Sequence, residues 1–381
     1  MDHGLPALSL YIHVPWCIRK CPYCDFNSHQ VRDEIPEQAY VDQLIKDLQQ
    51  ERERAGDRII ESIFIGGGTP SLFTPDSYEQ ILKAVNHHFR VKPGAEITLE
   101  ANPGTFEQVR FEGYRHAGIN RVSIGVQSFA DQQLKALGRI HSSEEADTAI
   151  QSAKTIFDRI NIDLMHGLPG QTPAQAISDL KRAIDFNPDQ ISWYQLTIEP
   201  NTEFAVRPPT LPVEEALWQI QEEGSELLEQ AGFRQYEISA FARSGGASQH
   251  NLNYWQFGDY LGIGAGAHGK LTRIINGELQ IERTHKLRQP KGYMNALNTL
   301  AGLEPILPAD RPFEFMLNAL RLTDGVSIET FLSTTGLSLS SIEKPIQRAQ
   351  QQGLLDKDDH RLKPTREGRL FLNDLLTQFI D

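Results

Sequence analysis

The feature that most limits the fold is a regular alternation of short apolar segments with longer amphipathic segments over about the first 240 residues. Apolar, β-branched runs predict six strands, at 8–14, 62–65, 96–101, 121–126, 161–165 and 190–198. Helical periodicity predicts six helices, at 37–54, 75–89, 106–117, 143–157, 173–186 and 213–231. Because six strand–helix units are fewer than the eight of a closed barrel, we predict an α/β fold with a partial (β/α)6, TIM-like barrel.

The remainder of the chain changes in character twice. The stretch from Gly245 to Gly269 is rich in Gly, aromatic and His residues without clear periodicity, and the Pro-rich stretch 305–312 marks a boundary. The tail has the order of a winged helix, with helices at 313–322, 328–334, 340–351 and 366–379 and a hairpin at 354–364. We therefore predict a barrel domain at 1–240, a barrel-closing and linker segment at 241–305 and a C-terminal winged-helix-like α+β domain at 306–381.

The charge balance argues against nucleic acid as a partner. The chain has 37 basic and 50 acidic residues, a net charge of −13, whereas a phosphate backbone attracts basic surfaces. From residue 310 onward there are nine Lys/Arg and eleven Asp/Glu, so the tail has no basic surplus either. No apolar run approaches the ~18 residues of a membrane-spanning helix, and the first residues lack a secretory signal. We expect a cytoplasmic protein with peripheral membrane association at most.

The three cysteines of the chain, Cys17, Cys21 and Cys24, follow the first predicted strand directly. Their odd number argues against a disulfide framework. Three thiolates on one loop can ligate three irons of a [4Fe–4S] cluster and leave the fourth iron open to another ligand. The alternative is a zinc site of the three cysteines with His13 or His29. The spacing favours the cluster.

Polar or glycine-rich residues also mark the ends of the other predicted strands. They are the run Gly66-Gly67-Gly68-Thr69-Pro70, Glu100 with Asn102, Gln127 with Arg139 beyond it, Asp163, and Thr197 with Glu199. Each alone would be an ordinary loop residue. Together they lie where parallel α/β sheets bind ligands, at the carboxyl ends of successive strands. We interpret them as one site.

The cysteine spacing and these strand ends together resemble the radical S-adenosylmethionine (SAM) superfamily. The resemblance implies that SAM chelates the open iron through its amino and carboxylate groups and is cleaved after one-electron transfer from the cluster. It also implies a set of SAM-binding positions: Tyr11, Tyr23, Gly67, Gly68, Thr69, Glu100, Gln127, Arg139 and Asp163.

Stretches along most of the chain resemble the group built around the coproporphyrinogen III dehydrogenase HemN, namely 11–17, 66–70, 125–129, 161–169 and 261–269. Two departures distinguish the chain from that enzyme. The enzyme has a further Cys where this chain has Phe26, and it has an N-terminal extension before the first strand. Both features are similar to the HemW family of haem chaperones, as is His250-Asn251-Leu252-Asn253-Tyr254-Trp255.

The chemistry of this last segment suits haem. A neutral His250 imidazole is a good axial ligand for haem iron, and Tyr254 and Trp255 offer flat apolar faces for a porphyrin. The alternative is a structural histidine in a loop that closes the barrel. His268 is a second candidate, although the resemblance implies that it lies near SAM.

We therefore expect a haem chaperone that binds a [4Fe–4S] cluster, SAM and haem and delivers the haem to haemoproteins. The alternatives are an oxygen-independent coproporphyrinogen III dehydrogenase, which decarboxylates two propionates oxidatively, and a zinc-binding regulator that uses its winged helix. The resemblance implies respiratory haemoproteins as recipients and a C-terminal domain that covers the barrel, and it allows a homodimer. It assigns a cofactor set without deciding whether the chain is an enzyme.

Overall fold

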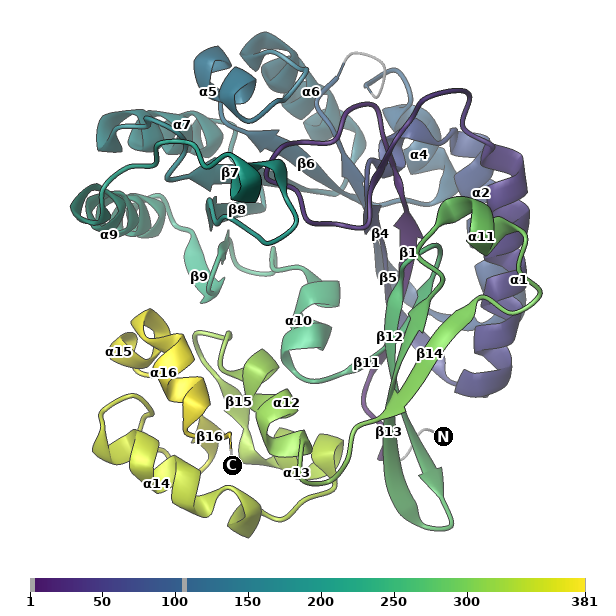
Figure 1. Cartoon of the computed structure of the whole chain (residues 1–381), viewed down its shortest axis with the longest axis vertical. Coiled ribbons are helices and arrows are strands. Elements are labelled where there is room, and N and C mark those ends of the chain that lie inside the picture. The colour runs from purple at the N-terminus through teal and green to yellow at the C-terminus, as the bar shows by residue number, and fades with distance from the viewer. Residues whose placement is uncertain (1–3, 105–107, 381) are drawn as a thin grey trace.

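The computed structural model describes residues 4–104 and 108–380, which form one twelve-stranded sheet with helices outside it (Figure 1). The six predicted strands are present as parallel neighbours in chain order. They are β1 (Leu8–Val14), β4 (Ile59–Gly67), β5 (Arg90–Ala101), β6 (Arg121–Gln127), β7 (Arg159–His166) and β8 (Gln190–Gln195). The predicted α/β partial barrel is confirmed.

Helices cover the outer face of this sheet. They are α1 (Glu37–Ala55), α2 (Pro75–His88), α4 (Phe111–Ala117), α5 (Asp131–Ala136), α6 (Ser143–Ile156), α7 (Pro173–Asp185) and α9 (Glu214–Gln230). The short helix α8 (Glu203–Val206) lies instead against the segment after β1, where the Phe204 amide donates to the Pro22 carbonyl (3.0 Å). Ser142 and Thr172 each begin a helix with a capping box, which satisfies amides that the first turn leaves unpaired. The predicted helix 106–117 begins later, at Phe111, and its residues 106–107 lie outside the described residues.

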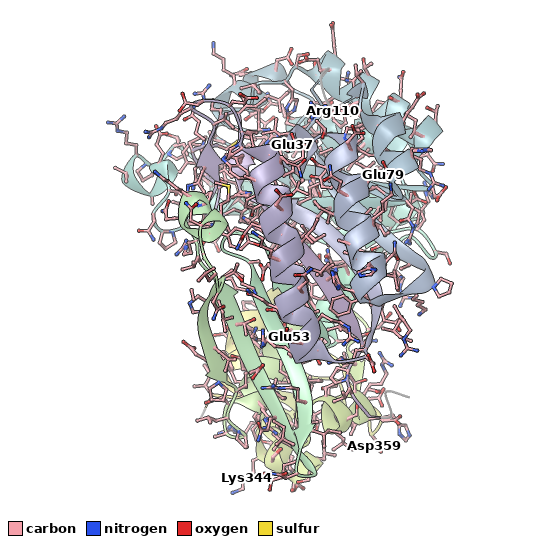
Figure 2. All side chains as sticks on the ribbon, turned by 90° about the vertical axis from the view of Figure 1, so that its right-hand side faces the viewer. Glu37, Glu53, Glu79, Arg110, Lys344 and Asp359 are labelled. Atoms are coloured by element: carbon pink, nitrogen blue, oxygen red, sulfur yellow. The ribbon has the colours of Figure 1, made fainter. Side chains whose placement is uncertain are left out.

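The segment without clear periodicity extends the sheet. Strand β11 (Asp259–Ile263) pairs parallel to β1, and three antiparallel strands continue outward: β12 (His268–Ile275), β13 (Glu278–Lys286) and β14 (Leu300–Pro305). The opposite edge adds β10 (Ala240–Ala242) and β9 (Arg234–Glu237). The sheet ends at β14 and β9, so the barrel is open. In Figure 2 the β12–β14 ribbon descends beside α1 towards the region of Lys344 and Asp359.

A short helix, α10 (Gln249–Trp255), lies against β1, β4 and β11. The buried Glu96 of β5 holds its first turn, because Oε1 accepts from the Gln249 amide (2.9 Å) and the Ser248 hydroxyl (3.3 Å). The other oxygen, Oε2, forms ion pairs with Arg159 (2.5 Å) and Arg121 (3.8 Å). A strand of the barrel therefore fixes the position of α10.

The two faces of the barrel wall differ in polarity. Outward side chains such as Leu10, Ile63 and Val122 are buried against the helices, each contributing about 1.5–3 kcal/mol. Polar side chains such as Arg121 and Ser123 are buried and line a cavity within the barrel. The barrel interior therefore has the character of a ligand site.

The C-terminal part forms a separate small core. Its elements are α12 (Arg311–Ala319), β15 (Val326–Ser327), α13 (Ile328–Thr335), α14 (Glu343–Gln351), β16 (Arg361–Leu362), α15 (Arg366–Leu370) and α16 (Leu372–Thr377). Trp255 of α10 and Ile281 of β13 join this core. The domain thus lies against α10 and the ends of the sheet, away from the purple loop that follows β1 (Figure 1).

Two details of the C-terminal prediction are wrong. The hairpin at 354–364 reduces to one bridge between Leu355 and Pro364, because β16 pairs with β15 instead. The last predicted helix breaks at Phe371, whose ψ of 47° leaves the helical range. Among the described residues, no helix combines the length and apolar character needed to cross a bilayer.

Candidate cluster and ligand site

The three cysteines lie on the loop between β1 and α1, and each is partly exposed. The Arg139 guanidinium donates to the Cys21 sulfur (3.7 Å), and the Cys24 sulfur lies 3.9 Å from the Ser28 hydroxyl. Burial raises the pKa of the Cys17 and Cys24 thiols. Thiols in such a setting stay protonated unless a bound metal holds the thiolate form. The donor set on this loop therefore fits an iron–sulfur cluster.

The zinc alternative fits less well. In the part of the chain that the structure describes, no three His, Cys, Asp or Glu side chains gather around one point as a single ion requires. Both ring nitrogens of His13 are engaged, Nδ1 with the Tyr11 hydroxyl (2.8 Å) and Nε2 with the Asn27 carbonyl (2.9 Å). In a cluster each thiolate binds a different iron, so the three sulfurs need not converge.

A cavity of about 680 Å³, here called the cysteine-side cavity, extends from this loop into the barrel. It brings together eleven of the predicted site residues: Cys17, Cys21, Cys24, Tyr23, Gly67, Gly68, Thr69, Glu100, Gln127, Arg139 and Asp163. Its volume lies in the ~300–1,000 Å³ range of small-molecule sites. Thr197 and Glu199 are not among its lining residues, because β8 ends at Gln195 and their side chains bond to each other (2.8 Å).

The glycine run at the end of β4 packs closely against the cysteine loop. A Cβ at Gly68 would lie 2.6 Å from the Trp16 carbonyl oxygen, and Gly67 has a φ of 117°. The amides of this run are used within the fold, since Gly68 donates to Val14 (2.7 Å) and Thr69 to Trp16 (2.7 Å). The run therefore fixes the loop on which the cysteines lie.

Two carboxyl groups give the cavity its electrostatic character. Burial and the nearby Asp163 raise the pKa of Glu100 to about 8, although the Gly67 amide donates to Glu100 Oε2 (3.0 Å). Burial also raises the pKa of Asp163, which accepts from Ser123 (2.9 Å) and Asn161 (2.7 Å). Two carboxyls that share a buried site favour a cationic ligand, which relieves their repulsion.

Arg139 and Gln127 also line this cavity, and Gln127 ends β6, the strand between those of Glu100 and Asp163. Arg139 Nη2 donates to Asn102 Oδ1 (2.6 Å) and to the Gly125 carbonyl (2.8 Å). Gln127 has a φ of 68° at a register irregularity between β6 and β7, which turns the chain at the strand end. Burial raises the pKa of Tyr23, so its hydroxyl stays a hydrogen-bonding group. These side chains are held in place before any ligand binds.

The histidine of the predicted haem segment lies in the core. His250 is 1% exposed, and its ring stacks on Phe64 (centroids 5.1 Å) and meets Tyr254 edge-on (4.7 Å). Nδ1 lies 3.3 Å from the Ser62 hydroxyl, whereas Nε2 is buried without a hydrogen bond among the described residues. Burial lowers the pKa of His250 to about 3. His250 lines neither large cavity, so its role as haem ligand stays a prediction.

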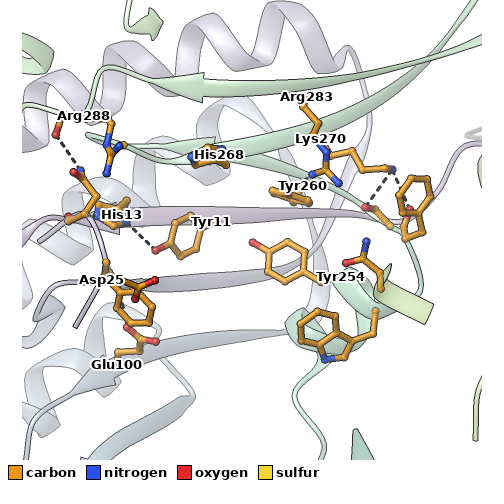
Figure 3. Close-up of a pocket in the computed structure, with 18 residues that line it drawn as sticks. Tyr11, His13, Asp25, Glu100, Tyr254, Tyr260, His268, Lys270, Arg283 and Arg288 are labelled. Atoms are coloured by element: carbon orange, nitrogen blue, oxygen red, sulfur yellow. Dashed lines mark hydrogen bonds between the residues drawn. The ribbon is translucent and has the colours of Figure 1, made fainter. Parts of the chain in front are cut away.

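A second cavity of about 580 Å³, here called the strand-side cavity, lies between β1, α10 and the β12–β13 pair (Figure 3). The sequence indicated Tyr11, His268, Tyr254 and Trp255 among its lining, but not Tyr260, Lys270, Arg283 and Arg288. The alternation of polar with apolar residues in β12 was the signal that could have placed a polar face there. The two cavities adjoin, since Phe26, Gly67, Glu100, Tyr254 and Trp255 line both.

Comparisons with known proteins agree with this architecture. Residues 11–183 match the Radical SAM superfamily, and residues 306–371 match the HemN C-terminal domain. The chain is 51% identical over 381 residues to the haem chaperone HemW of Haemophilus influenzae, covering 99% of this chain and 98% of the relative. It is 49% identical over 377 residues to the haem chaperone HemW of Escherichia coli, covering 99% of both.

A solved structure gives an independent comparison of the fold. Coproporphyrinogen III oxidase (HemN) from Escherichia coli, described as a radical SAM enzyme, superimposes with a TM-score of 0.82. The alignment covers 99% of this chain and 91% of that chain at 24% identity. At that identity the similarity establishes the fold and leaves the activity to the site.

Proposed function

The chain belongs to the HemW family of haem chaperones within the radical SAM superfamily, and we propose that it binds a [4Fe–4S] cluster, SAM and haem and delivers the haem to haemoproteins. The observation that supports this most is the cysteine-side cavity. It unites the three thiols with the strand-end carboxyls, so one volume offers both a cluster and a place for a cationic ligand.

Cys17, Cys21 and Cys24 would hold three irons, and the cluster would supply an open iron and one-electron chemistry when bound. Arg139 supports the loop through its bond to Cys21 and keeps positive charge beside the sulfur. The chain's own contribution is a preformed, partly shielded set of sulfur donors.

SAM carries a sulfonium and an ammonium group, so the Glu100 and Asp163 carboxyls suit it. A bound cation beside Glu100 would return its raised pKa towards the ordinary range and release a proton. Thr69 is held by Asn102, whose amide donates to the Thr69 hydroxyl (3.1 Å). Tyr11 lines the strand-side cavity instead, beside Gly67 and Glu100, so its contact with SAM stays a prediction.

Haem is the cargo of the proposed chaperone. The adjoining strand-side cavity has a volume of about 580 Å³, and aromatic side chains of α10 lie on the wall that it shares with the cysteine-side cavity. The recipients are proposed to be respiratory haemoproteins, met in the cytoplasm at the membrane face. The homodimer stays a prediction from the family resemblance.

The test is one anaerobically reconstituted sample assayed in parallel for haem binding and for coproporphyrinogen III turnover. We expect stoichiometric haem binding, transfer to an apo-haemoprotein of the respiratory chain, and no protoporphyrinogen IX with SAM and reductant present. Turnover without haem binding would replace this proposal with the dehydrogenase. Loss of transfer in a sample that still binds haem would limit the protein to storage.

A further inference from the structure

The strand-side cavity has basic side chains on one wall and carboxyl groups on the opposite wall. Figure 3 shows His268, Lys270, Arg283 and Arg288 along the wall of the outer strands, and Asp25 and Glu100 on the facing wall. The rings of Tyr11, Tyr254 and Tyr260 lie between the two walls. A flat ligand with an apolar body and an acidic edge would fit this arrangement.

The basic wall follows from the strand register. Antiparallel pairing places His268 opposite His285 and Lys270 opposite Arg283, so these side chains share one face of the β12–β13 pair. Two of the cations are already paired, since Lys270 contacts Asp259 (2.8 Å) and Arg283 contacts Glu314. Within the described residues the Arg288 guanidinium forms no ion pair and is exposed at the cavity edge. Arg288 is therefore the cation most available to a ligand.

The histidines near this cavity differ in whether a ring nitrogen is available to a ligand. His13 and His268 line this cavity, but both His13 ring nitrogens are used by Tyr11 and Asn27. The His268 ring is exposed, and no hydrogen bond to either of its nitrogens occurs among the described residues. His250 lies outside the lining. Of the histidines that the structure describes, only His268 combines a free ring nitrogen with a place on the cavity wall.

Aromatic faces complete the site. Tyr254 and Tyr260 meet edge to face with centroids 4.4 Å apart, and Phe26 projects into the same space with 60% of its surface exposed. Such rings contact a planar macrocycle on its faces. The Phe26 ring stands where the cavity adjoins the cysteine-side cavity, so an apolar ligand there would lie next to the cluster region.

We propose that haem binds in the strand-side cavity, with the His268 imidazole as an axial ligand to its iron and the Arg288 guanidinium paired with a propionate. This inference rests on the proposed haem-chaperone function and adds the place and the orientation of the cargo. The iron faces β12, and the propionates point to the exposed edge near Arg288. No covalent change is involved, because the imidazole nitrogen donates a lone pair and haem stays intact.

The first experiment is a haem titration followed by absorption spectroscopy. For H268A we expect a shifted Soret band and an affinity reduced by at least ~10-fold, because the coordinate bond is lost. H268G should recover the wild-type spectrum when free imidazole is added. H285A, which removes the facing histidine outside the cavity lining, should bind haem as the wild type does. Cluster iron content checks that each variant folds.

The second experiment tests the propionate contact. R288Q should weaken haem binding by roughly 10-fold, as expected for a lost charge-assisted hydrogen bond. Haem dimethyl ester should bind R288Q and wild type equally, because the esters carry no charge. R207Q is the matched control, since Arg207 is also exposed and lines neither cavity.

The outcomes of these experiments distinguish failure of the proposed function from failure of the proposed haem site. If the wild-type protein binds no haem, the proposed function fails. If the wild type binds haem and H268A retains its spectrum and affinity, or H285A or H250A loses them instead, the assignment of His268 fails while the function stands. An R288Q deficit that persists with the dimethyl ester would overturn the propionate contact.

Discussion

The two cavities differ in how the chain builds them. The cysteine-side cavity takes its residues from the ends of parallel strands, where the protein backbone converges by the geometry of the barrel. The strand-side cavity takes its basic wall from an antiparallel extension outside the six strand–helix units. The first presents partly exposed thiols and carboxyls, and the second combines a basic wall with the Glu100 carboxyl that the two cavities share. If SAM and haem bind as proposed, this difference would separate a cationic cofactor from an anionic cargo by charge.

The strongest test of whether the two cavities bind their ligands independently is to remove a thiol. C21S should abolish the cluster, reducing the iron content from about four atoms per chain to nearly none. Because Cys21 does not line the strand-side cavity, haem binding should persist. Iron analysis and haem titration of the same preparation measure both effects. If haem binding disappears together with the cluster, the two sites are not independent.

A smaller effect is expected from replacing Glu100, whose carboxyl lines both cavities. The folded pKa of Glu100 is raised from 4.5 to about 8, so the folded chain holds a proton that the unfolded chain has lost between these values. Its contribution to stability is therefore present at low pH and is lost as pH rises through 8. E100Q should be more stable than wild type at pH 9, by roughly 5 kcal/mol, and equal to it at pH 4.

Urea unfolding of the ligand-free proteins at the two pH values measures this difference. D76N, which changes an exposed carboxyl at the start of α2, serves as the control. E100Q should bind SAM more weakly than the wild type does, because the cationic ligand loses a negative partner. A Glu100 with an ordinary pKa would give the same stability difference at both pH values.

The smallest effect is expected at the boundary between the cavities. F26A should lower haem affinity several-fold, because an aromatic contact is removed, while stability changes by less than ~0.5 kcal/mol at an exposed site. F371A is a matched control, since Phe371 is 55% exposed and lies on the C-terminal domain. Equal haem affinity of the two variants would show that the Phe26 ring does not touch the cargo.

The six-strand barrel could be predicted because its signal is local. Strand β1 begins and ends where the apolar run does, and Ser142 with Glu145 marks the start of α6 through a capping box. The cysteine-side residues followed from their positions at strand ends. These features depend on neighbours along the chain or on a general property of parallel sheets.

The outer strands and the strand-side cavity could not be predicted in this way. Strand β11 is short, contains Gly262 and pairs with β1, which lies about 250 residues earlier in the chain. Arg283 and His268 face the same cavity only through the β12–β13 register, which no local pattern specifies. The last helix breaks at the exposed Phe371, where neither Gly nor Pro marks an end of the helix in the sequence.

The hydrogen bonds between Glu96 and the start of α10 limit how a ligand can reach the two cavities. Tyr254 and Trp255 of α10 line both cavities. The start of α10 is hydrogen-bonded to Glu96 of β5, and Arg159 and Arg121 neutralise this carboxylate. Moving α10 away from the barrel would break the contacts of the buried Glu96 carboxylate, at a cost of several kcal/mol. If haem binds as proposed, it would enter and leave past the exposed Arg288 and Phe26, so loading and release would use the same opening.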